Sequence, residues 1–153
     1  MEEELRLYSF VIFYLSPLQH GLQTAHLVGD LSQKCARSKR YNRWAGHDKT
    51  IIILNGGNRK DIEDIFNLLW EICPSMDLPF DKFHEDEDSL GGIITCCGVI
   101  VPERYFNAVK FDDGYYFNIS EIDENSNIHS QYYFPPESPE YKLIDLIKSK
   151  RLA

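Results

Sequence analysis

Three runs of almost uninterrupted apolar residues constrain the fold of this chain more than any other feature of its sequence. The runs span residues 7–15 (LYSFVIFYL), 49–54 (KTIIIL) and 92–101 (GIITCCGVIV). They are rich in β-branched and aromatic residues, which favour β-strands. A strand without alternation between apolar and polar residues is typical of a sheet that is covered on both faces. The runs therefore predict a central sheet with helices packed against it.

The segments between these runs predict two helices and a loop. Residues 22–37 carry an apolar face at helical spacing, and residues 38–48 are polar and basic, which is typical of a connecting loop. Asn58 is a favourable N-cap for a second helix that reaches about Cys73. The apolar positions of these helices are Thr24, Leu27, Val28, Leu31 and Cys35 in the first and Ile62, Ile65, Phe66 and Leu69 in the second.

A further short strand is expected at residues 80–83, before the acidic turn 85–88 and the last apolar run. The order is thus β-α-β-α-β-β, and a strand–helix–strand succession implies a right-handed parallel crossover. We expect an α/β domain with a small mixed sheet, mainly parallel and flanked by helices.

The pattern changes after the third apolar run. We assign residues 1–106 to an α/β core domain and residues 107–153 to an aromatic-rich extension packed on that core. In the extension, residues 115–119 and 130–134 predict a hairpin across the turn 123–127, and residues 141–150 predict a terminal helix. Its tyrosines and phenylalanines suit a small satellite core or a protein interface, including a homodimer, and both interpretations stay open.

Charge is unevenly distributed along the 153 residues. The chain has a net charge of −8, yet residues 1–60 hold nine lysines and arginines against five acidic residues, a balance of +4. The overall acidity makes duplex nucleic acid an unfavourable partner. A local basic patch in the first 60 residues is nevertheless compatible with the overall negative charge. An apolar run of about 20 residues is missing and the start MEEELRLYSF is acidic, so we expect a cytoplasmic protein without a membrane partner.

The cysteines and acidic residues do not form a recognised metal motif. Cys35, Cys73, Cys96 and Cys97 include no C-x-x-C pair, and we expect buried, reduced thiols. The acidic run 85–88 lacks the spacing of a calcium loop and is interpreted as a solvated turn. We therefore predict neither a metal site nor a cofactor. P-loop, G-x-S-x-G and H-E-x-x-H motifs are also missing from the sequence.

The junction after the first strand gathers the residues that are best suited to binding. In parallel α/β folds, ligands bind beyond the carboxyl ends of the strands. His26 is a candidate ligand donor or general base there, although a structural histidine is the simpler interpretation. Lys49 and Arg104 would supply charge for a phosphate, and Trp44 would stack on a nucleotide ring. The predicted ligand-binding set is Gln19, Gly21, Gln23, His26, Trp44, Lys49, Asn55, Glu85 and Arg104.

Three segments carry a resemblance to known proteins: residues 9–26 (SFVIFYLSPLQHGLQTAH), 43–57 (RWAGHDKTIIILNGG) and 83–106 (FHEDEDSLGGIITCCGVIVPERYF). They resemble a group of uncharacterised tailed-phage proteins, which are similar to the archaeal/eukaryotic-type peptidyl-tRNA hydrolase fold. The resemblance covers roughly residues 7–106. The hydrolase family begins its first helix with G-K-x-A-A-Q-x-x-H-A; Gly21 matches the glycine, whereas Leu22 stands at the catalytic lysine.

The resemblance implies a hydrolase-like fold without the family's catalytic lysine, and three functions follow as alternatives. The first is a non-catalytic phage protein that binds a host protein or a small nucleotide in the host cytoplasm, including a defence signal that it would sequester. The second is a divergent hydrolase of peptidyl-tRNA or a nucleotide ester, with His26 as base and Asp88 or Glu85 orienting it. The third is a protein-interaction or homodimer module built from the extension.

Overall fold

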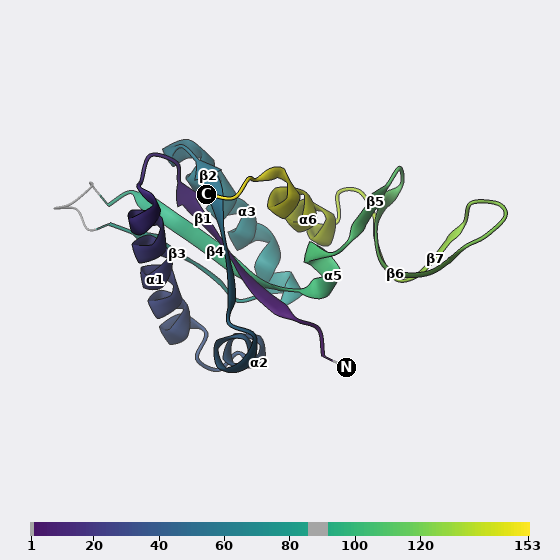
Figure 1. Ribbon diagram of the computed structural model, residues 1–153, viewed down its shortest axis with the longest axis horizontal. Helices are drawn as coiled ribbons and strands as arrows, with labels where there is room; N and C mark the ends of the chain where they lie inside the picture. The colour runs from purple at the N-terminus through teal and green to yellow at the C-terminus, as the bar shows by residue number, and fades with distance from the viewer. Residues whose placement is uncertain (1, 86–91) are drawn as a thin grey trace.

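The computed structural model describes residues 2–85 and 92–153. Its main sheet contains β1 (Leu5–Ile12), β2 (Thr50–Gly57), β3 (Phe80–His84) and β4 (Ile94–Pro102) in the order β2-β1-β4-β3 (Figure 1). The mixed α/β architecture is confirmed. The expectation of a mainly parallel sheet is wrong, because β1 is parallel to β2 but antiparallel to β4, and β4 is antiparallel to β3. The short β3–β4 connection explains the antiparallel β3–β4 pair, since parallel strands need a crossover of a dozen or more residues.

Helices cover both faces of this sheet. Helix α1 (Pro17–Lys34) lies on one face, and α3 (Arg59–Met76) and α6 (Pro139–Ser149) lie on the other (Figure 1). Successive side chains of β1 and β4 alternate between the two apolar clusters. The side chains that point toward α3 are Tyr8, Phe10, Ile12, Cys97, Val99 and Val101. Those that point toward α1 are Leu5, Leu7, Val11, Cys96 and Ile100.

Helix α1 begins at Pro17, five residues before the predicted start. Ser16 is its N-cap, because its side chain accepts a hydrogen bond from the Gln19 N–H while the Gln19 side chain accepts one from the Ser16 N–H. Proline at the first helical position has the φ angle that the helix needs. The Ser16–Pro17 pair thus starts the helix as well as ending the strand. The predicted Asn58 cap of α3 is confirmed, since its side chain accepts from the Asp61 N–H.

The predicted loop at 38–48 is instead helical. Ser38 caps α2 (Lys39–Arg43), which continues into a π-helical turn, η1 (Trp44–Asp48). The loop prediction failed because the segment is polar, although Tyr41 and Trp44 are three residues apart and both buried. The π turn closes with a hydrogen bond of 2.8 Å from the Lys49 N–H to the Trp44 carbonyl, and Lys49 adopts a left-handed conformation with φ of 57°.

Helix α5 (Glu103–Phe106) lies at the end of the core, and the extension that follows forms a second sheet in the order β5-β6-β7. Its strands are β5 (Val109–Phe111), β6 (Gly114–Ile122) and β7 (Ile128–Phe134), so the predicted hairpin is present and longer than expected. At the base of this sheet, Tyr115 and Phe134 join α6 in the same apolar cluster as α3. The distal part of the β6–β7 hairpin stands clear of the body as an arm (Figure 1).

The last residues of the chain lie along the free edge of β2. The Asn55 N–H donates to the Arg151 carbonyl at 2.8 Å, and the Ala153 N–H donates to the Ile53 carbonyl at 3.0 Å. Residues 151–153 thereby occupy backbone groups of an edge strand that would otherwise face solvent.

The cysteines form no disulfide, in agreement with the expected reduced thiols. Cys73, Cys96 and Cys97 are buried, whereas Cys35 is half-buried. Burial raises the pKa of Cys73 and of Cys96 to about 12, so both are neutral thiols near pH 7.

Candidate functional site

The strand directions separate the predicted site residues into two groups at opposite ends of the sheet. Arg6 is opposite Thr50 in β2, and Leu5 is opposite Pro102 in β4. Lys49 precedes Thr50 and Arg104 follows Pro102, so both lie at the amino end of β1. Their expected grouping with His26, which lies beyond the carboxyl end, is therefore wrong. Because β2 runs parallel to β1, a residue that precedes β2 lies at the amino end of β1. Because β4 runs antiparallel to β1, a residue that follows β4 lies at this same end, opposite to the predicted crevice.

At the carboxyl end, three side chains form a hydrogen-bonded chain. The Thr95 hydroxyl donates to Gln23 Oε1 at 3.1 Å, and Gln23 Nε2 donates to Glu85 Oε1 at 2.7 Å. Gln23 is buried between α1 and the sheet, and Glu85 is half-buried just after β3. The structure thus brings together two residues of the predicted set that are 62 positions apart in the sequence.

A second group of neutral polar atoms lies on the same face of the sheet. Ser9 Oγ is 2.8 Å from Thr24 Oγ1 and 3.1 Å from Cys96 Sγ. Among the described residues, the buried polar side chains are Ser9, Gln23, Thr24 and Thr95, and all of them pack between α1 and the sheet. Because these groups are neutral and hydrogen-bonded, they avoid the large penalty of a buried charge.

His26 is exposed and stacks on Phe83, with 4.6 Å between ring centroids and 16° between ring planes. In the part of the chain that the structure describes, no carboxylate contacts its ring, and Glu85 bonds to Gln23 instead. Asp88, the other candidate orienting group, lies outside the described residues. The catalytic arrangement expected for His26 is therefore not assembled by the described side chains.

The remaining predicted residues of this end have local structural roles. The Gln19 amide caps α1, and Gly21 lies on the exposed face of that helix. Asn55 is exposed, and its Oδ1 accepts from the Gly57 N–H, which shapes the turn after β2. Close to this turn in the fold, the segment after β1 exposes several large apolar side chains: Phe13, Tyr14, Leu18 and Leu22.

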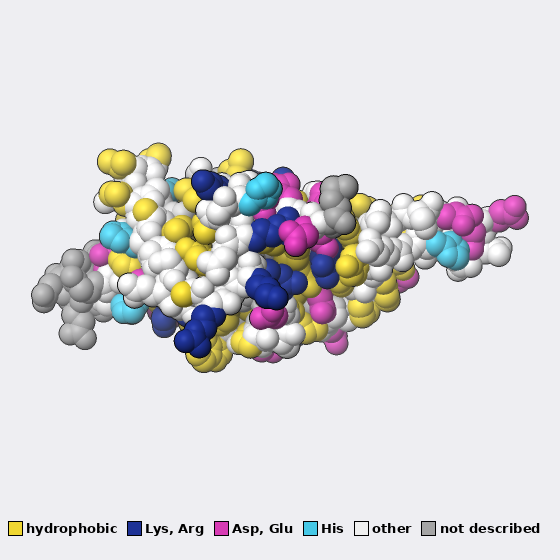
Figure 2. All heavy atoms as spheres, turned by 90° about the horizontal axis from the view of Figure 1, so that it is seen from below, with side chains coloured by type: hydrophobic (Ala, Val, Ile, Leu, Met, Phe, Trp, Pro, Cys, Tyr) yellow, Lys and Arg dark blue, Asp and Glu magenta, His cyan; other side chains and the backbone are white. Residues whose placement is uncertain are grey.

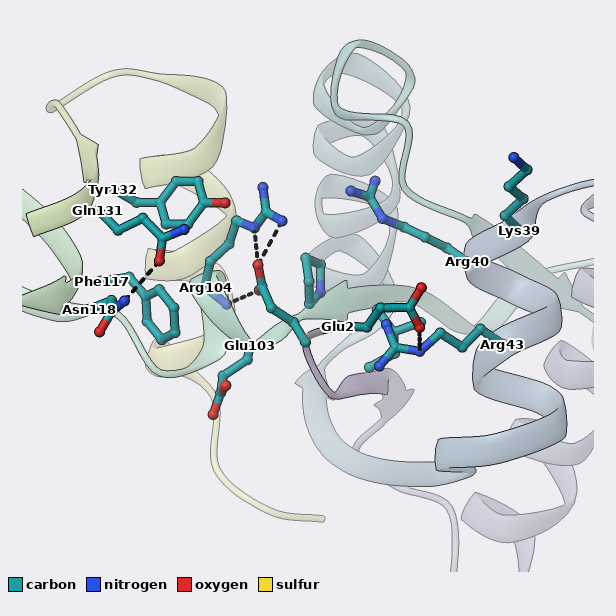
Figure 3. A pocket seen from close by; sticks show the side chains of 13 residues that line it. Glu2, Lys39, Arg40, Arg43, Glu103, Arg104, Phe117, Asn118, Gln131 and Tyr132 are labelled. Carbon is teal, nitrogen blue, oxygen red and sulfur yellow. Dashed lines mark hydrogen bonds and ion pairs between the residues drawn. The ribbon is translucent and has the colours of Figure 1, made fainter.

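The amino end of the sheet opens into a pocket of about 790 Å³ between α2 and the base of the hairpin. Figure 3 shows side chains of α2 on one side, those of β6 and β7 on the other, and Arg104 between them. On this face of the molecule, lysine and arginine side chains gather around the middle of the body, interspersed with acidic ones (Figure 2). The described lining includes the cations Lys39, Arg40, Arg43 and Arg104 and the acids Glu2, Glu3 and Glu103.

Most of these cations are fixed by acceptors of the protein itself. Arg104 pairs with Glu3 through Nη2 at 2.6 Å and Nε at 2.8 Å, and the Arg104 backbone N–H also donates to this carboxylate. Arg43 Nε lies 3.0 Å from Glu2. Arg40 Nη1 donates to the Met76 and Asp77 carbonyls. Lys39 is exposed and makes no ion pair with the described residues, so its charge is open to an incoming anion.

The opposite wall carries rings and amides. Phe117 and Tyr132 lie with ring centroids 6.1 Å apart, and the Arg104 guanidinium lies 4.5 Å from the Tyr132 ring centroid. Asn118 Nδ2 donates to Gln131 Oε1 at 2.8 Å. This wall can stack on a planar ring and can hydrogen-bond to its edge.

Trp44, by contrast, belongs to the core. Its side chain is 3% exposed, and its Nε1–H donates to the Thr50 carbonyl at 2.8 Å. A ligand ring therefore has no access to it, and the stacking role expected for Trp44 is wrong. Lys49 is exposed after the π turn and is not part of the pocket lining.

Sequence reasoning missed the α2 cations and the aromatic wall as one site. The signal was present in Ser38, which is a helix cap, and in the spacing of Lys39 and Arg43, which places them one helical turn apart. Nothing local in the sequence, however, indicates that the hairpin would return to face α2.

Comparison with known proteins identified neither a matching family model nor a matching curated protein. In the described ranges, no helix is both long enough and apolar enough to cross a membrane. The same residues contain no group of three or more histidine, cysteine, aspartate or glutamate side chains placed to hold a metal ion.

Proposed function

We propose that this protein is a non-catalytic binding protein for a small, phosphate-bearing ligand of the nucleotide type. The observation that carries the proposal is the convergence of Lys39, Arg40, Arg43 and Arg104 on one pocket whose facing wall presents two rings and two amides. Cations suit the phosphate, rings suit stacking on a base, and amides suit the polar edge of a base.

Charge supports an anionic ligand at this place. The chain as a whole is at −8, yet the described lining holds four cations and three acids. Glu3 Oε1 already accepts hydrogen bonds from Nε and Nη2 of Arg104, which supports an oxyanion as a ligand of this guanidinium. Glu2 is 79% exposed at its side chain, so a phosphate can displace it from Arg43 at little cost in buried contacts.

The chemistry of the lining favours binding over turnover. The described lining contains no serine, threonine, cysteine or histidine that could act as nucleophile or general base. Its glutamates already accept from other side chains: Glu2 from Arg43, Glu3 from Arg104 and Glu103 from Asn107. A ligand held here would be withheld from other proteins and not converted. With the resemblance to tailed-phage proteins, this supports a role in sequestering a nucleotide-derived signal of host defence.

The test is titration calorimetry with ADP, a cyclic dinucleotide and inorganic pyrophosphate at low ionic strength. Lys39→Glu should weaken binding at least about tenfold, because it reverses a lining cation that has no acceptor among the described residues. The matched control is Lys60→Glu, which changes the net charge equally but lies at the start of α3, at the other end of the sheet. Equal loss in both variants, or no binding of any of the three probes, would contradict the proposal.

A second candidate function is favoured by the carboxyl-end chain. Gln23 fixes the Glu85 carboxylate at the end of β3, and a carboxylate held in this way is suited to take a proton from water. In a divergent hydrolase of peptidyl-tRNA or a nucleotide ester, Glu85 would then replace His26 as the base. Single-turnover assays with peptidyl-tRNA under enzyme excess distinguish the two functions: this one requires a product that disappears in Glu85→Gln, and the binding protein yields none.

A further inference from the structure

The outer edge of β7 is open. β7 pairs with β6 on one side, and no described strand pairs with the other side. Its sequence, IHSQYYF, contains neither a lysine, an arginine, an acidic residue nor a proline. Natural edge strands are normally protected by such residues or by a covering segment. The free edge of β2 illustrates the usual solution, because residues 151–153 lie along it.

The arm that carries this edge has little support of its own. β5 pairs with β6 only from Gly114 to Tyr116, so beyond that point the arm is a two-stranded hairpin. An isolated two-stranded hairpin is marginally stable in water. The hairpin also exposes apolar surface, since Ile122 in the arm is 54% exposed and Tyr133 at its base is 46% exposed. A third strand would satisfy the backbone groups and cover part of this surface.

We propose that β7 pairs in antiparallel orientation with the β7 of a second copy, across a two-fold axis near Gln131. The two three-stranded sheets then become one continuous six-stranded sheet. A two-fold axis perpendicular to β7 makes the strand antiparallel to its own copy, so the interface closes on itself and forms a dimer. This inference concerns association of the chain and does not depend on the proposed ligand.

Charge favours a second copy as the occupant. Two chains at −8 repel each other, and they can approach closely only through a surface without acidic residues. β7 itself has no acidic side chain. In the turn that follows β6, Asp123 pairs with His129 of β7 at 3.2 Å, and Glu124 lies next to it at the tip of the arm. In Figure 1 the distal part of the β6–β7 hairpin projects away from the helices.

The main test uses opposite charges at the centre of β7. Wild-type protein should show a concentration-dependent dimer in sedimentation velocity between about 1 and 100 µM, the range of a small interface. Gln131→Lys and Gln131→Glu each place like charges across the axis, so each should weaken dimerisation at least about tenfold. An equimolar mixture should restore a heterodimer, which native mass spectrometry separates by mass. Circular dichroism checks that both variants are folded.

A second measurement locates the contact. In a Cys35→Ser background, Gln131→Cys should form an intermolecular disulfide on mild oxidation, because directly opposed β-carbons lie about 4.5–5.5 Å apart. The control is Asn125→Cys at the tip of the same arm, which should cross-link far more slowly. Wild-type protein that stays monomeric throughout the concentration range, variants that dimerise as well as wild type, or equal cross-linking at both positions would overturn the proposal. Loss of nucleotide binding in Lys39→Glu has no bearing on these outcomes.

Discussion

At the carboxyl end of β1 the polar side chains are mostly neutral and buried, whereas at the amino end they are charged and reach solvent. Gln23 and Thr95 are hydrogen-bonded to each other between α1 and the sheet. Arg43 and Arg104 find carboxylates from the first residues of the chain. A buried hydrogen-bonded amide contributes mainly to stability, because its removal leaves its partners unpaired. A solvated ion pair contributes little to stability and can exchange its partner for a ligand. The comparison teaches that polar residues at two ends of one sheet need not serve the same purpose.

The largest effect that we expect on stability is that of Gln23→Ala. The substitution leaves the Thr95 hydroxyl without its acceptor and the Glu85 carboxylate without its donor, which should lower the free energy of unfolding by about 2 kcal/mol. Urea unfolding followed by circular dichroism measures it. Gln33→Ala is the control, an exposed position of the same helix, where a change within about 0.5 kcal/mol is expected. A similar change in the free energy of unfolding for Gln23→Ala and Gln33→Ala would contradict the structural role assigned to the buried carboxyl end.

A smaller effect is expected at the amino end. Arg104→Ala removes the ion pair of Nε and Nη2 with Glu3 Oε1, and because both side chains are partly exposed the loss should be about 1 kcal/mol. Arg59→Ala provides a control, since its pair with Glu63 is more exposed and should contribute almost nothing. If Arg104→Ala destabilises the protein more than Gln23→Ala in the same urea assay, the amino end is structural and its role as a ligand site loses support.

The third effect is expected in the extension, and it appears as a dependence of stability on alkaline pH. Tyr116 donates to Asp113 Oδ2 at 2.7 Å, and this hydrogen bond to a carboxylate raises the pKa of Tyr116 to about 12. An unfolded tyrosine loses its proton near pH 10. Between about pH 10 and 12 the folded state therefore holds a proton that the unfolded state has lost, so the free energy of unfolding falls as pH rises and is unaffected below this window.

Tyr116→Phe removes this contribution and should make the alkaline decline shallower. Urea midpoints of wild type and variant at pH 9 and pH 11.5 measure the difference. Parallel declines would mean that the Tyr116–Asp113 pair does not couple to folding, and the extension would then resemble the solvated amino end more than the buried carboxyl end.

The central strands and α3 could be predicted from the sequence, because uninterrupted apolar runs and a good N-cap are local signals. The direction of β4 and the position of Arg104 could not, because they depend on which strand β4 joins, and its apolar residues fit either neighbour. The sequence placed Gln23 and Glu85 in the same predicted ligand-binding set but did not predict that they contact each other. A contact between residues 62 positions apart leaves no local pattern in the sequence. Trp44 misled the interpretation because an aromatic residue in a basic segment is equally compatible with a ligand platform and with a core anchor.

The covering of β2 by residues 151–153 also has a consequence for the time course of synthesis. β2 ends at Gly57, and the residues that lie along its edge are made more than ninety positions later. At about 5–20 residues per second, this edge stays open for roughly 5 to 20 s after β2 has been translated. During that interval the isoleucine-rich strand is exposed to neighbouring nascent chains. Polysomes crowded with this message would therefore present the protein at its most aggregation-prone stage.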